Sequence, residues 1–294
     1  MAGLVDGVLV VDKPSGPTSH DVVARARRLY GTREVGHAGT LDPMASGVLV
    51  LMFGQACKLS QYLTALAKRY RAEVSFGRST DSLDALGVTV DERALAPGWL
   101  DRGVLEQALS AERARSEQVP PAISAIQVGG QRAYRAARRG EPLELAPRAV
   151  LTHELSLLEA SDERVVLELE VSKGYYVRSL ARDLGAALGV PAHLAQLRRL
   201  ASGAFTLDGA AAWPLDAPVP LVPTALAATR VLPPVTLTEG GVAHARAGRA
   251  LAAEHFVVEP EAGVCAWLST TGDLIALGQR EPTGEHRVVR GFQR

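Results

Sequence analysis

One carboxylate stands out as a group able to do chemistry. It is Asp42, in the run Gly-His-Ala-Gly-Thr-Leu-Asp-Pro-Met-Ala-Ser-Gly over residues 36–47. Pro43 disfavours a helical backbone at the residue before it, so we expect Asp42 in an extended loop. The loop leads into an apolar run over 48–53, which is bounded by glycines and is typical of a buried strand. A carboxylate fixed in a loop at the mouth of a rigid sheet is well placed to act as a nucleophile or general base.

Simpler interpretations of the same loop stay open at this point. An aspartate before proline is often a turn former or a helix cap. The loop does not match the Gly-x4-Gly-Lys-Ser/Thr or Gly-x-Gly-x-x-Gly patterns of nucleotide-binding sites. His37, in the same run, has the chemistry of a general base, a metal ligand or a hydrogen-bonding loop residue. No second histidine or cysteine lies nearby at ligand spacing, which argues against a metal site.

Length and composition indicate a globular protein with a sizeable core. The 294 residues suggest one large domain, or a large domain with a small one, and 47% of them are hydrophobic. No apolar stretch approaches the length of a membrane span, and the apolar run over 8–11 is too short for a signal peptide. Cys57 and Cys265 are the only cysteines, so we expect no disulfide framework and no thiolate zinc site. These features favour a cytoplasmic, reduced protein.

The formal net charge is zero, which by itself argues weakly against nucleic acid as a partner. The charges are nevertheless unevenly distributed, because acidic residues crowd into 154–170 while arginines recur along 132–139. Such a stripe suits a phosphate backbone, although a solvated helix face explains it equally well. It consists of Arg132, Arg135, Arg138 and Arg139, with Tyr134 among them, on a segment that we expect to be helical.

The elements that must position these residues can be outlined from periodicity. Helices are expected over 19–30, 55–67, 101–115, 177–188 and 192–200, and strands over 48–53, 70–76 and 165–171. Strands and helices are interspersed, and hairpin-like pairings and irregular connections outnumber regular βαβ units, so we predict an α+β fold with a mixed or largely antiparallel sheet and flanking helices. Six of the 17 prolines lie between 214 and 234, which marks a domain boundary. The predicted domains are therefore 1–230 and a small β-rich domain over 235–294.

The run over 36–47 resembles the active-site motif of the TruB family of pseudouridine synthases, which modify the TΨC loop of tRNA. Five further segments resemble motifs of the same family, so the resemblance covers essentially the first 210 residues. They are Val11–Ser19, Lys68–Ala72, Gln118–Gln127, Ser172–Leu180 and Leu194–Leu200, together with the basic run that follows Gly129-Gly130. The resemblance implies a pseudouridine-synthase-like fold.

The resemblance also assigns roles around Asp42, the expected catalytic nucleophile. Arg178 matches the arginine that pairs with that aspartate, at a helix start where the macrodipole disfavours a cation. Tyr70 matches a tyrosine that stacks on the target uracil and is a candidate for the proton abstraction at C5. Its local pattern suggests a core residue, and we expect it at the first position of its strand. Tyr176 matches a residue that contacts the target nucleotide.

Three further matches concern the loop and the walls of the pocket. Leu197 would close the apolar side of the uracil pocket, although a helix-face leucine is its ordinary interpretation. Lys13 would brace the loop that carries Asp42. His37 would fill the gap left when the uridine is extruded from the RNA loop, which partly offsets the cost of unstacking the base.

Residues 118–145 resemble the family's RNA-gripping insertion, where Arg132 and Arg135 would contact the substrate. The insertion departs from the family at two positions. Ile123 stands where most members have an aromatic residue, and Gln127 stands where most have a lysine. We expect these departures to tune affinity and to leave the reaction intact.

The resemblance predicts an isomerase that converts uridine to pseudouridine in the T-arm of tRNA. No cofactor, no metal and no obligatory protein partner is expected, and a monomer suffices. Residues 235–294 resemble, more weakly, a PUA-type RNA-binding domain that would contact the acceptor end of tRNA. Three alternatives remain: a guide-RNA-dependent synthase acting on ribosomal RNA, a non-catalytic RNA-binding protein or tRNA chaperone, and a carbohydrate hydrolase. The last needs a second catalytic carboxylate within about 10 Å of the first.

Overall fold

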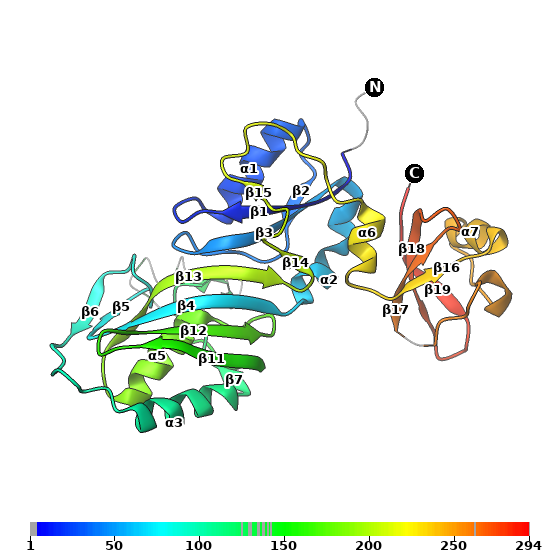
Figure 1. Ribbon diagram of the computed structural model, residues 1–294. Coiled ribbons are helices and arrows are strands. Elements are labelled where there is room, and N and C mark those ends of the chain that lie inside the picture. The colour runs from blue at the N-terminus through cyan, green and yellow to red at the C-terminus, as the bar shows by residue number, and fades with distance from the viewer. Residues whose placement is uncertain are drawn as a thin grey trace.

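A large α+β body is followed along the chain by a small β-rich body, as Figure 1 shows. The computed structural model describes residues 5–124, 126–128, 131–133, 136, 139, 141, 143–261 and 263–293. The α+β fold with a mixed sheet and a β-rich C-terminal region is confirmed. None of the described helices is both long enough and apolar enough to cross a bilayer.

The large body is built on one sheet, to which nine strands of the described chain contribute. These are β1 (Gly7–Lys13), β2 (Val35–His37), β3 (Ser46–Phe53), β4 (Lys68–Phe76), β11 (Thr152–Ala160), β12 (Arg164–Val171), β13 (Ala192–Ser202), β14 (Phe205–Thr206) and β15 (Ala211–Ala212). Their order is β11-β12-β4-β13-β3-β1-β15, with β14 beside β13 and β2 beside β3. The pairs β13–β3 and β1–β15 are parallel, and the others are antiparallel.

Over β4, β12 and β11, helices cover one face of this sheet and leave the other face open, whereas β1 and β3 are buried on both faces. The helices of the large body are α1 (Ser19–Tyr30), α2 (Ser60–Ala65), α3 (Arg102–Arg113) and α5 (Val177–Leu188). α5 packs on β13 and β4, and α3 packs on α5 and β11. Alternate residues of β4, such as Ala72 and Val74, are buried beneath these helices. This is the pattern expected of a half-buried strand.

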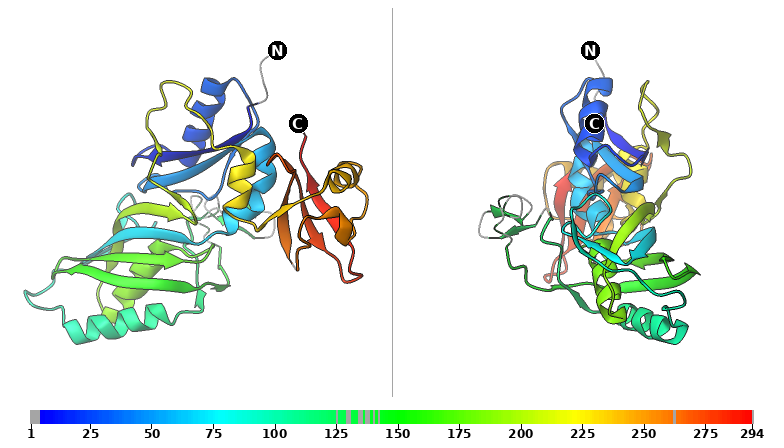
Figure 2. Two further views of the ribbon diagram at one scale, coloured as in Figure 1. Left: turned by 45° about the vertical axis from the view of Figure 1, so that its right-hand side comes forward. Right: turned by 90° about the vertical axis from the view of Figure 1, so that its left-hand side faces the viewer.

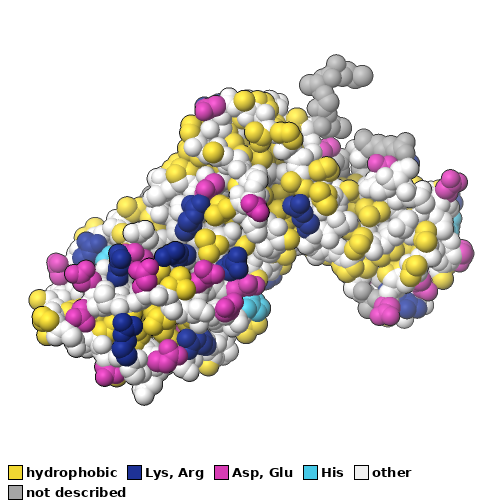
Figure 3. All heavy atoms as spheres, viewed as in Figure 1, with side chains coloured by type: hydrophobic (Ala, Val, Ile, Leu, Met, Phe, Trp, Pro, Cys, Tyr) yellow, Lys and Arg dark blue, Asp and Glu magenta, His cyan; other side chains and the backbone are white. Residues whose placement is uncertain are grey.

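The open face carries ion pairs between the side chains of β4, β12 and β11. Figure 3 shows basic and acidic side chains interspersed over β4 and β12. The pairs are Arg69–Glu168 (3.9 Å), Arg71–Glu159 (3.5 Å) and Arg164–Glu73 (3.4 Å). Because their charges are largely balanced within the protein, this face lacks the net positive charge that a phosphate backbone requires.

The prediction of a helix over 192–200 is wrong, because this segment forms strand β13. The spacing of Leu194, Leu197 and Leu200 suggested a helical period. In β13 the register shifts between Leu194 and Gln196, and again between Arg199 and Ala201. Each shift adds one residue to the alternation, so a bulged strand imitates a spacing of three.

Three smaller differences concern the other elements. The helix expected over 55–67 is a 3₁₀ segment, η1 (Gly54–Leu59), followed by the short α2. Tyr70 is the third residue of β4 and not its first. The arginine stripe expected on a helix begins in strand β9, which ends at Arg132, while Arg135 and Arg138 lie outside the described residues.

The large body also contains short two-stranded sheets. They are β5 (Arg78–Thr80) with β6 (Thr89–Glu92), β7 (Glu117–Gln118) with β10 (Arg148–Ala149), and β8 (Gln127–Val128) with β9 (Gln131–Arg132). Gln118 and Arg148 pair across β7 and β10. This pairing joins the two ends of the segment expected to form the RNA-gripping insertion.

The small body is a four-stranded sheet with its own core. Its elements are β16 (Pro234–Thr236), α7 (Glu239–Arg246), η2 (Ala253–His255), β17 (Val264–Leu268), β18 (Leu274–Arg280) and β19 (His286–Gly291). Trp267 is fully buried at the centre of this core.

The two bodies share a continuous apolar cluster, which lies around α2 and the connecting helix α6 (Thr224–Thr229). In the left view of Figure 2, α6 (yellow) lies between the large body and the sheet of the small one. Leu59 and Leu63 from the large body belong to the same cluster as Leu277 from the small one. Lys58 reinforces the contact, because its ammonium donates to the carbonyl oxygen of Gly291 at 2.8 Å and lies 5.2 Å from the ring centre of Phe292.

Candidate active site

The loop between β2 and β3, which carries Asp42, is held by a buried cation. Arg199 is 1% exposed and donates to three carbonyl oxygens of this segment: those of Val48 (2.6 Å), Gly39 (3.1 Å) and Thr40 (3.4 Å). Gly47 has φ +102°, and a Cβ there would overlap the backbone of Arg199. The close approach of these two segments therefore requires glycine.

Lys13 holds the same loop from β1. Its side chain is fully buried, and its ammonium donates to the carbonyl oxygens of Pro14 and Pro17 at 2.8 Å and of Pro43 at 3.5 Å. Burial lowers the pKa of Lys13 to about 8, and the charge of nearby Asp42 opposes that shift. The contact with Pro43, the neighbour of Asp42, is the geometry expected of a brace.

Arg178 grips the Asp42 carboxylate with two hydrogen bonds. Its Nε donates to Oδ2 at 2.9 Å, and its Nη2 donates to Oδ1 at 3.2 Å. The arginine side chain is 6% exposed and the aspartate side chain 34%. A planar guanidinium that meets both oxygens fixes the orientation of the carboxylate, while one side of that carboxylate remains open.

The position of Arg178 at the start of α5 is electrostatically unfavourable by itself. Tyr176, the N-cap residue, provides no side-chain cap. Gln118 instead clamps the Tyr176 backbone, since its amide donates to the carbonyl (3.1 Å) and accepts from the N–H (2.8 Å). The first residues of the expected insertion are thereby tied to the helix that presents the arginine.

A residue that we did not anticipate, Asp84, lies on the other side of the arginine. Its Oδ2 is 3.8 Å from Arg178 Nε, and Arg178 Nη1 donates to the Ser82 carbonyl at 2.8 Å. Asp84 is 6% exposed and accepts hydrogen bonds from the Ser82 hydroxyl (2.8 Å) and the Leu86 N–H (3.0 Å). Leu83 between them has φ +62°, a strained conformation for leucine that holds this turn against the arginine.

No spacing signal marks Asp84 in the sequence, because the residue meets Arg178 only through the pairing of its turn with β13. The Ala85 N–H and the Leu83 carbonyl both bond to the backbone of Leu194 at 3.0 Å. The one available clue was indirect. An arginine in the first turn of a helix needs acceptors, and Asp42 accounts for only two of its donors.

Asp42, Tyr70, Tyr176, Arg178 and Leu197 line a single pocket of about 420 Å³. The two tyrosines are half-buried, and Leu197 is 8% exposed. Burial raises the pKa of the Tyr176 hydroxyl, so it stays protonated near neutrality. The pocket thus offers aromatic faces, one apolar wall and one oriented carboxylate, which suits a planar base attached to a sugar.

Of the other expected site residues that the structure describes, neither His37 nor Arg132 is among the residues that line this pocket. His37 ends β2 and is half-buried. Burial is the main cause that lowers the pKa of His37, and the nearby charge of Arg199 lowers it further, so a neutral imidazole is favoured. Ile123 lines the pocket. Arg132 ends β9, and Arg135 lies outside the described residues.

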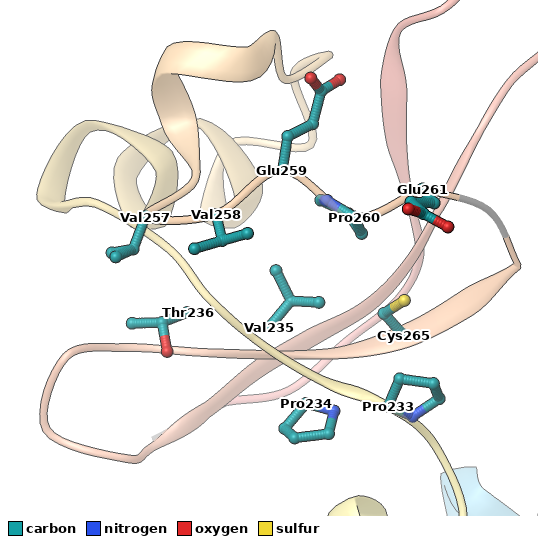
Figure 4. A pocket seen from close by; sticks show the side chains of 10 residues that line it. All are labelled: Pro233, Pro234, Val235, Thr236, Val257, Val258, Glu259, Pro260, Glu261 and Cys265. Carbon is teal, nitrogen blue, oxygen red and sulfur yellow. The ribbon is translucent and has the colours of Figure 1, made fainter.

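A second hollow, of about 560 Å³, lies in the small body between β16 and the segment over 257–261 (Figure 4). It is lined mainly by valines and prolines, and Glu259 and Glu261 are its only charged lining residues among those described. An apolar hollow with carboxylates does not suit a phosphate backbone. Across the described chain, no three His, Cys, Asp or Glu side chains are grouped so that they could hold a metal ion.

Comparison with known proteins gives consistent matches over nearly the whole chain. Residues 27–177 match the family model "TruB family pseudouridylate synthase (N terminal domain)", and residues 178–217 match "tRNA pseudouridylate synthase B C-terminal domain". The chain is 43% identical to tRNA pseudouridine synthase B of Mycobacterium sp. (strain KMS), covering 98% of this chain and 97% of the relative. It is 44% identical to the protein of that name from Cutibacterium acnes (strain DSM 16379 / KPA171202), covering 98% and 99%.

Solved structures agree in fold. A Cbf5-Nop10-Gar1 complex matches with a TM-score of 0.72 and 25% identity, covering 98% of this chain and 84% of that one. An H/ACA RNP bound to a substrate RNA containing 2′-deoxyuridine matches with a TM-score of 0.72 and 24% identity, covering 98% and 85%. With the matched family models and relatives, these results show that the chain belongs to the TruB family of pseudouridine synthases.

Proposed function

We propose that this chain isomerises uridine to pseudouridine in the TΨC loop of tRNA, with Asp42 as the nucleophile. The observation that carries the proposal is the Asp42 carboxylate, which is oriented by a buried arginine and faces the pocket that Tyr70, Tyr176 and Leu197 help to line. The relatives named tRNA pseudouridine synthase B, which match over nearly their full length, support the choice of substrate.

In the proposed reaction an Asp42 oxygen attacks C1′ of the target ribose. The bond from C1′ to N1 breaks, and its electron pair leaves with the uracil. The base rotates within the pocket until C5 faces C1′, then attacks that carbon and displaces the carboxylate. Loss of the proton from C5 and gain of a proton at N1 complete the isomerisation and regenerate the enzyme. Covalent catalysis by a carboxylate thus divides one difficult rearrangement into two displacements.

The surrounding residues have distinct parts in this proposal. Arg178 orients the nucleophile, and Tyr70 stacks on the uracil and is the candidate to receive the C5 proton. Tyr176 and Leu197 confine the base while it turns. Outside the pocket, His37 fills the space that the extruded uridine leaves in the RNA loop. The insertion over 118–145, including Arg132 and Arg135, grips the T-arm.

The alternative functions are less well supported by the same geometry. A glycoside hydrolase needs a second carboxylate open to its substrate, whereas Asp84 is buried and already hydrogen-bonded. A purely RNA-binding protein has no need of an oriented, partly open carboxylate. The guide-dependent alternative rests on relatives whose structures contain partner proteins, and activity of the purified chain alone would exclude it.

The decisive experiment measures tritium release from a tRNA transcript that carries 5-tritiated uridine. We expect release by the wild-type chain and none by Asp42→Asn, while filter binding shows equal affinity for the RNA. No release by the wild-type chain despite tight binding would refute the proposal. The structure of the adduct with a 5-fluorouridine RNA distinguishes attack at C1′ from addition at C6.

We also propose that residues 235–294 form a PUA-like domain that contacts the acceptor end of tRNA, and that the enzyme acts in the cytoplasm as a monomer without a protein partner. The domain shares a core cluster with the large body, so deleting it would expose apolar surface. Shortening the RNA is the cleaner test. If an isolated T-arm bound as tightly as full-length tRNA, the acceptor-end contact would be wrong.

A further inference from the structure

Lys173 differs from the other lysines of the chain because no residue that the structure describes engages its ammonium. Only four lysines occur, at 13, 58, 68 and 173. The ammonium groups of the first three donate to backbone carbonyl oxygens within the protein. Lys173 is exposed, lines the active-site pocket, and has no hydrogen-bond or carboxylate partner among the described residues.

The pocket beside Lys173 carries more positive than negative charge. Lys68, Lys173, Arg178 and Arg199 line it, and Asp42 is its only lining carboxylate among the described residues. Asp42 is engaged by Arg178, which leaves three cations without a carboxylate in the pocket. An anionic ligand would supply the missing negative charge.

The cations are close enough to affect one another. Lys68 is 6% exposed, and its ammonium donates to the carbonyl oxygens of Thr64 and Leu66 at 2.6 Å. Its pKa falls to about 8, chiefly through burial and further through the charges of Arg199 and Lys173. Lys173 therefore stands at the exposed end of a positively charged group whose other members are enclosed by protein.

The turn that carries Lys173 is fixed in place. The Ser172 N–H donates to the Leu151 carbonyl at 2.8 Å, and the Leu151 N–H donates to the Ser172 hydroxyl at 2.9 Å. Gly174, with φ +85°, completes the turn before the pocket residue Tyr175. A cation on a fixed turn loses less freedom on binding than one on a loose loop.

We propose that Lys173 binds the backbone phosphate next to the target uridine, on its 5′ or 3′ side, and so holds the flipped nucleotide over Asp42. The proposal rests on the function proposed above and names the part of the substrate that this lysine recognises. The uracil and ribose of the target are neutral, so the phosphates are the anionic groups of the RNA that can meet the excess positive charge. A phosphate contact positions the nucleotide and carries no base specificity.

The test is a double-substitution cycle between protein and RNA. The probe is a T-arm stem-loop with normal phosphates, or with a neutral methylphosphonate at one of the two positions that flank the target uridine. Dissociation constants are measured by filter binding for the wild-type chain and Lys173→Gln. Arg28→Gln is the matched control, since it removes the same charge from an exposed position on α1.

We expect Lys173→Gln to weaken binding of the normal RNA about tenfold. The slope of log affinity against log salt concentration should also become shallower, by the amount that about one phosphate contact contributes. For one of the two methylphosphonate RNAs, wild type and Lys173→Gln should bind equally, because the charge that the lysine recognises is gone. Lys173→Arg should retain most of the affinity, and Arg28→Gln should bind as the wild type does.

The proposal would be overturned if Lys173→Gln lost the same factor of affinity, relative to wild type, for the normal RNA and for both methylphosphonate RNAs. It would also be overturned if Lys173→Gln bound the normal RNA as tightly as the wild type does. The readout is binding, so it does not depend on turnover. Failure of the proposed function would appear separately, as absence of tritium release by the wild-type chain on unmodified tRNA.

Discussion

Arg178→Lys tests whether the geometry of the guanidinium, beyond its charge, is needed for catalysis. The arginine makes three hydrogen bonds, two to the oxygens of Asp42 and one to the Ser82 carbonyl. A lysine keeps the charge but presents one compact ammonium, which can satisfy a single one of these acceptors well. The substitution therefore removes two charge-assisted hydrogen bonds from a largely buried site.

The size of the effect follows from those two bonds. Each contributes about 1.5–3 kcal/mol when buried. Water can replace part of the contact, because the Asp42 side chain is 34% exposed. Taking the lower bound for both gives about 3 kcal/mol, which corresponds to a loss of about a hundredfold in kcat. The loss should fall on kcat because the arginine orients the proposed nucleophile and its own side chain is only 6% exposed.

The assay is single-turnover tritium release from 5-tritiated tRNA, with filter binding to check that affinity is unchanged. Arg182→Lys is the matched control. It makes the same replacement on the same helix, at a residue that contacts Asp183 and the Val119 carbonyl. We expect that control to retain wild-type activity. A loss of less than fivefold in correctly folded Arg178→Lys would refute the reasoning, since charge alone would then suffice.

Three further predictions concern the buried support of the site and the small body. Asp84→Asn should lower kcat about tenfold with RNA affinity unchanged, since it removes the second carboxylate beside Arg178; equal kcat values would contradict that role. The pKa of Lys13 is about 8 in the folded protein, against 10.5 for an ordinary lysine. Between these two pH values the lysine holds its proton only in the unfolded chain, so the free energy of unfolding of the wild type rises with pH. The free energy of unfolding of Lys13→Met, relative to wild type, should therefore fall by about 1–2 kcal/mol between pH 7.5 and 10 in urea titrations, solvent screening being allowed for. Gly278→Ala would place a Cβ into the Trp267 ring, so thermal unfolding should show about 2 kcal/mol of destabilisation, and an unchanged melting temperature would argue against that packing.

Regular periodicity and capping made several elements predictable from the sequence. Thr18 and Asp21 form a capping box at the start of α1, and Gly31 ends that helix in the left-handed conformation, which explains the agreement with the segment expected over 19–30. The apolar run after Gly47 forms β3, an interior strand of the sheet between β13 and β1. In both cases the local signal and the tertiary environment favour the same structure.

Prediction failed where the structure depends on pairing between distant segments. The two bulges in β13 follow from its partnership with β4, and a pattern of single residues cannot show them. Asp84 reaches Arg178 because its turn bonds to Leu194 of β13. The motif around Asp42 located the candidate nucleophile, whereas the second carboxylate beside its arginine became visible only in three dimensions.

The contact between Lys58 and Gly291 has a consequence for the order of events during synthesis. The two residues are 233 positions apart, and the apolar cluster that they flank includes Leu59 and Leu63 on one side and Leu277 on the other. A ribosome releases the large body first, so the surface around α2 stays uncovered until β18 and β19 emerge. During that interval the nascent chain exposes a hydrophobic patch that chaperones can bind or that can aggregate. Slower translation through the final strands would lengthen this exposure without changing the folded enzyme.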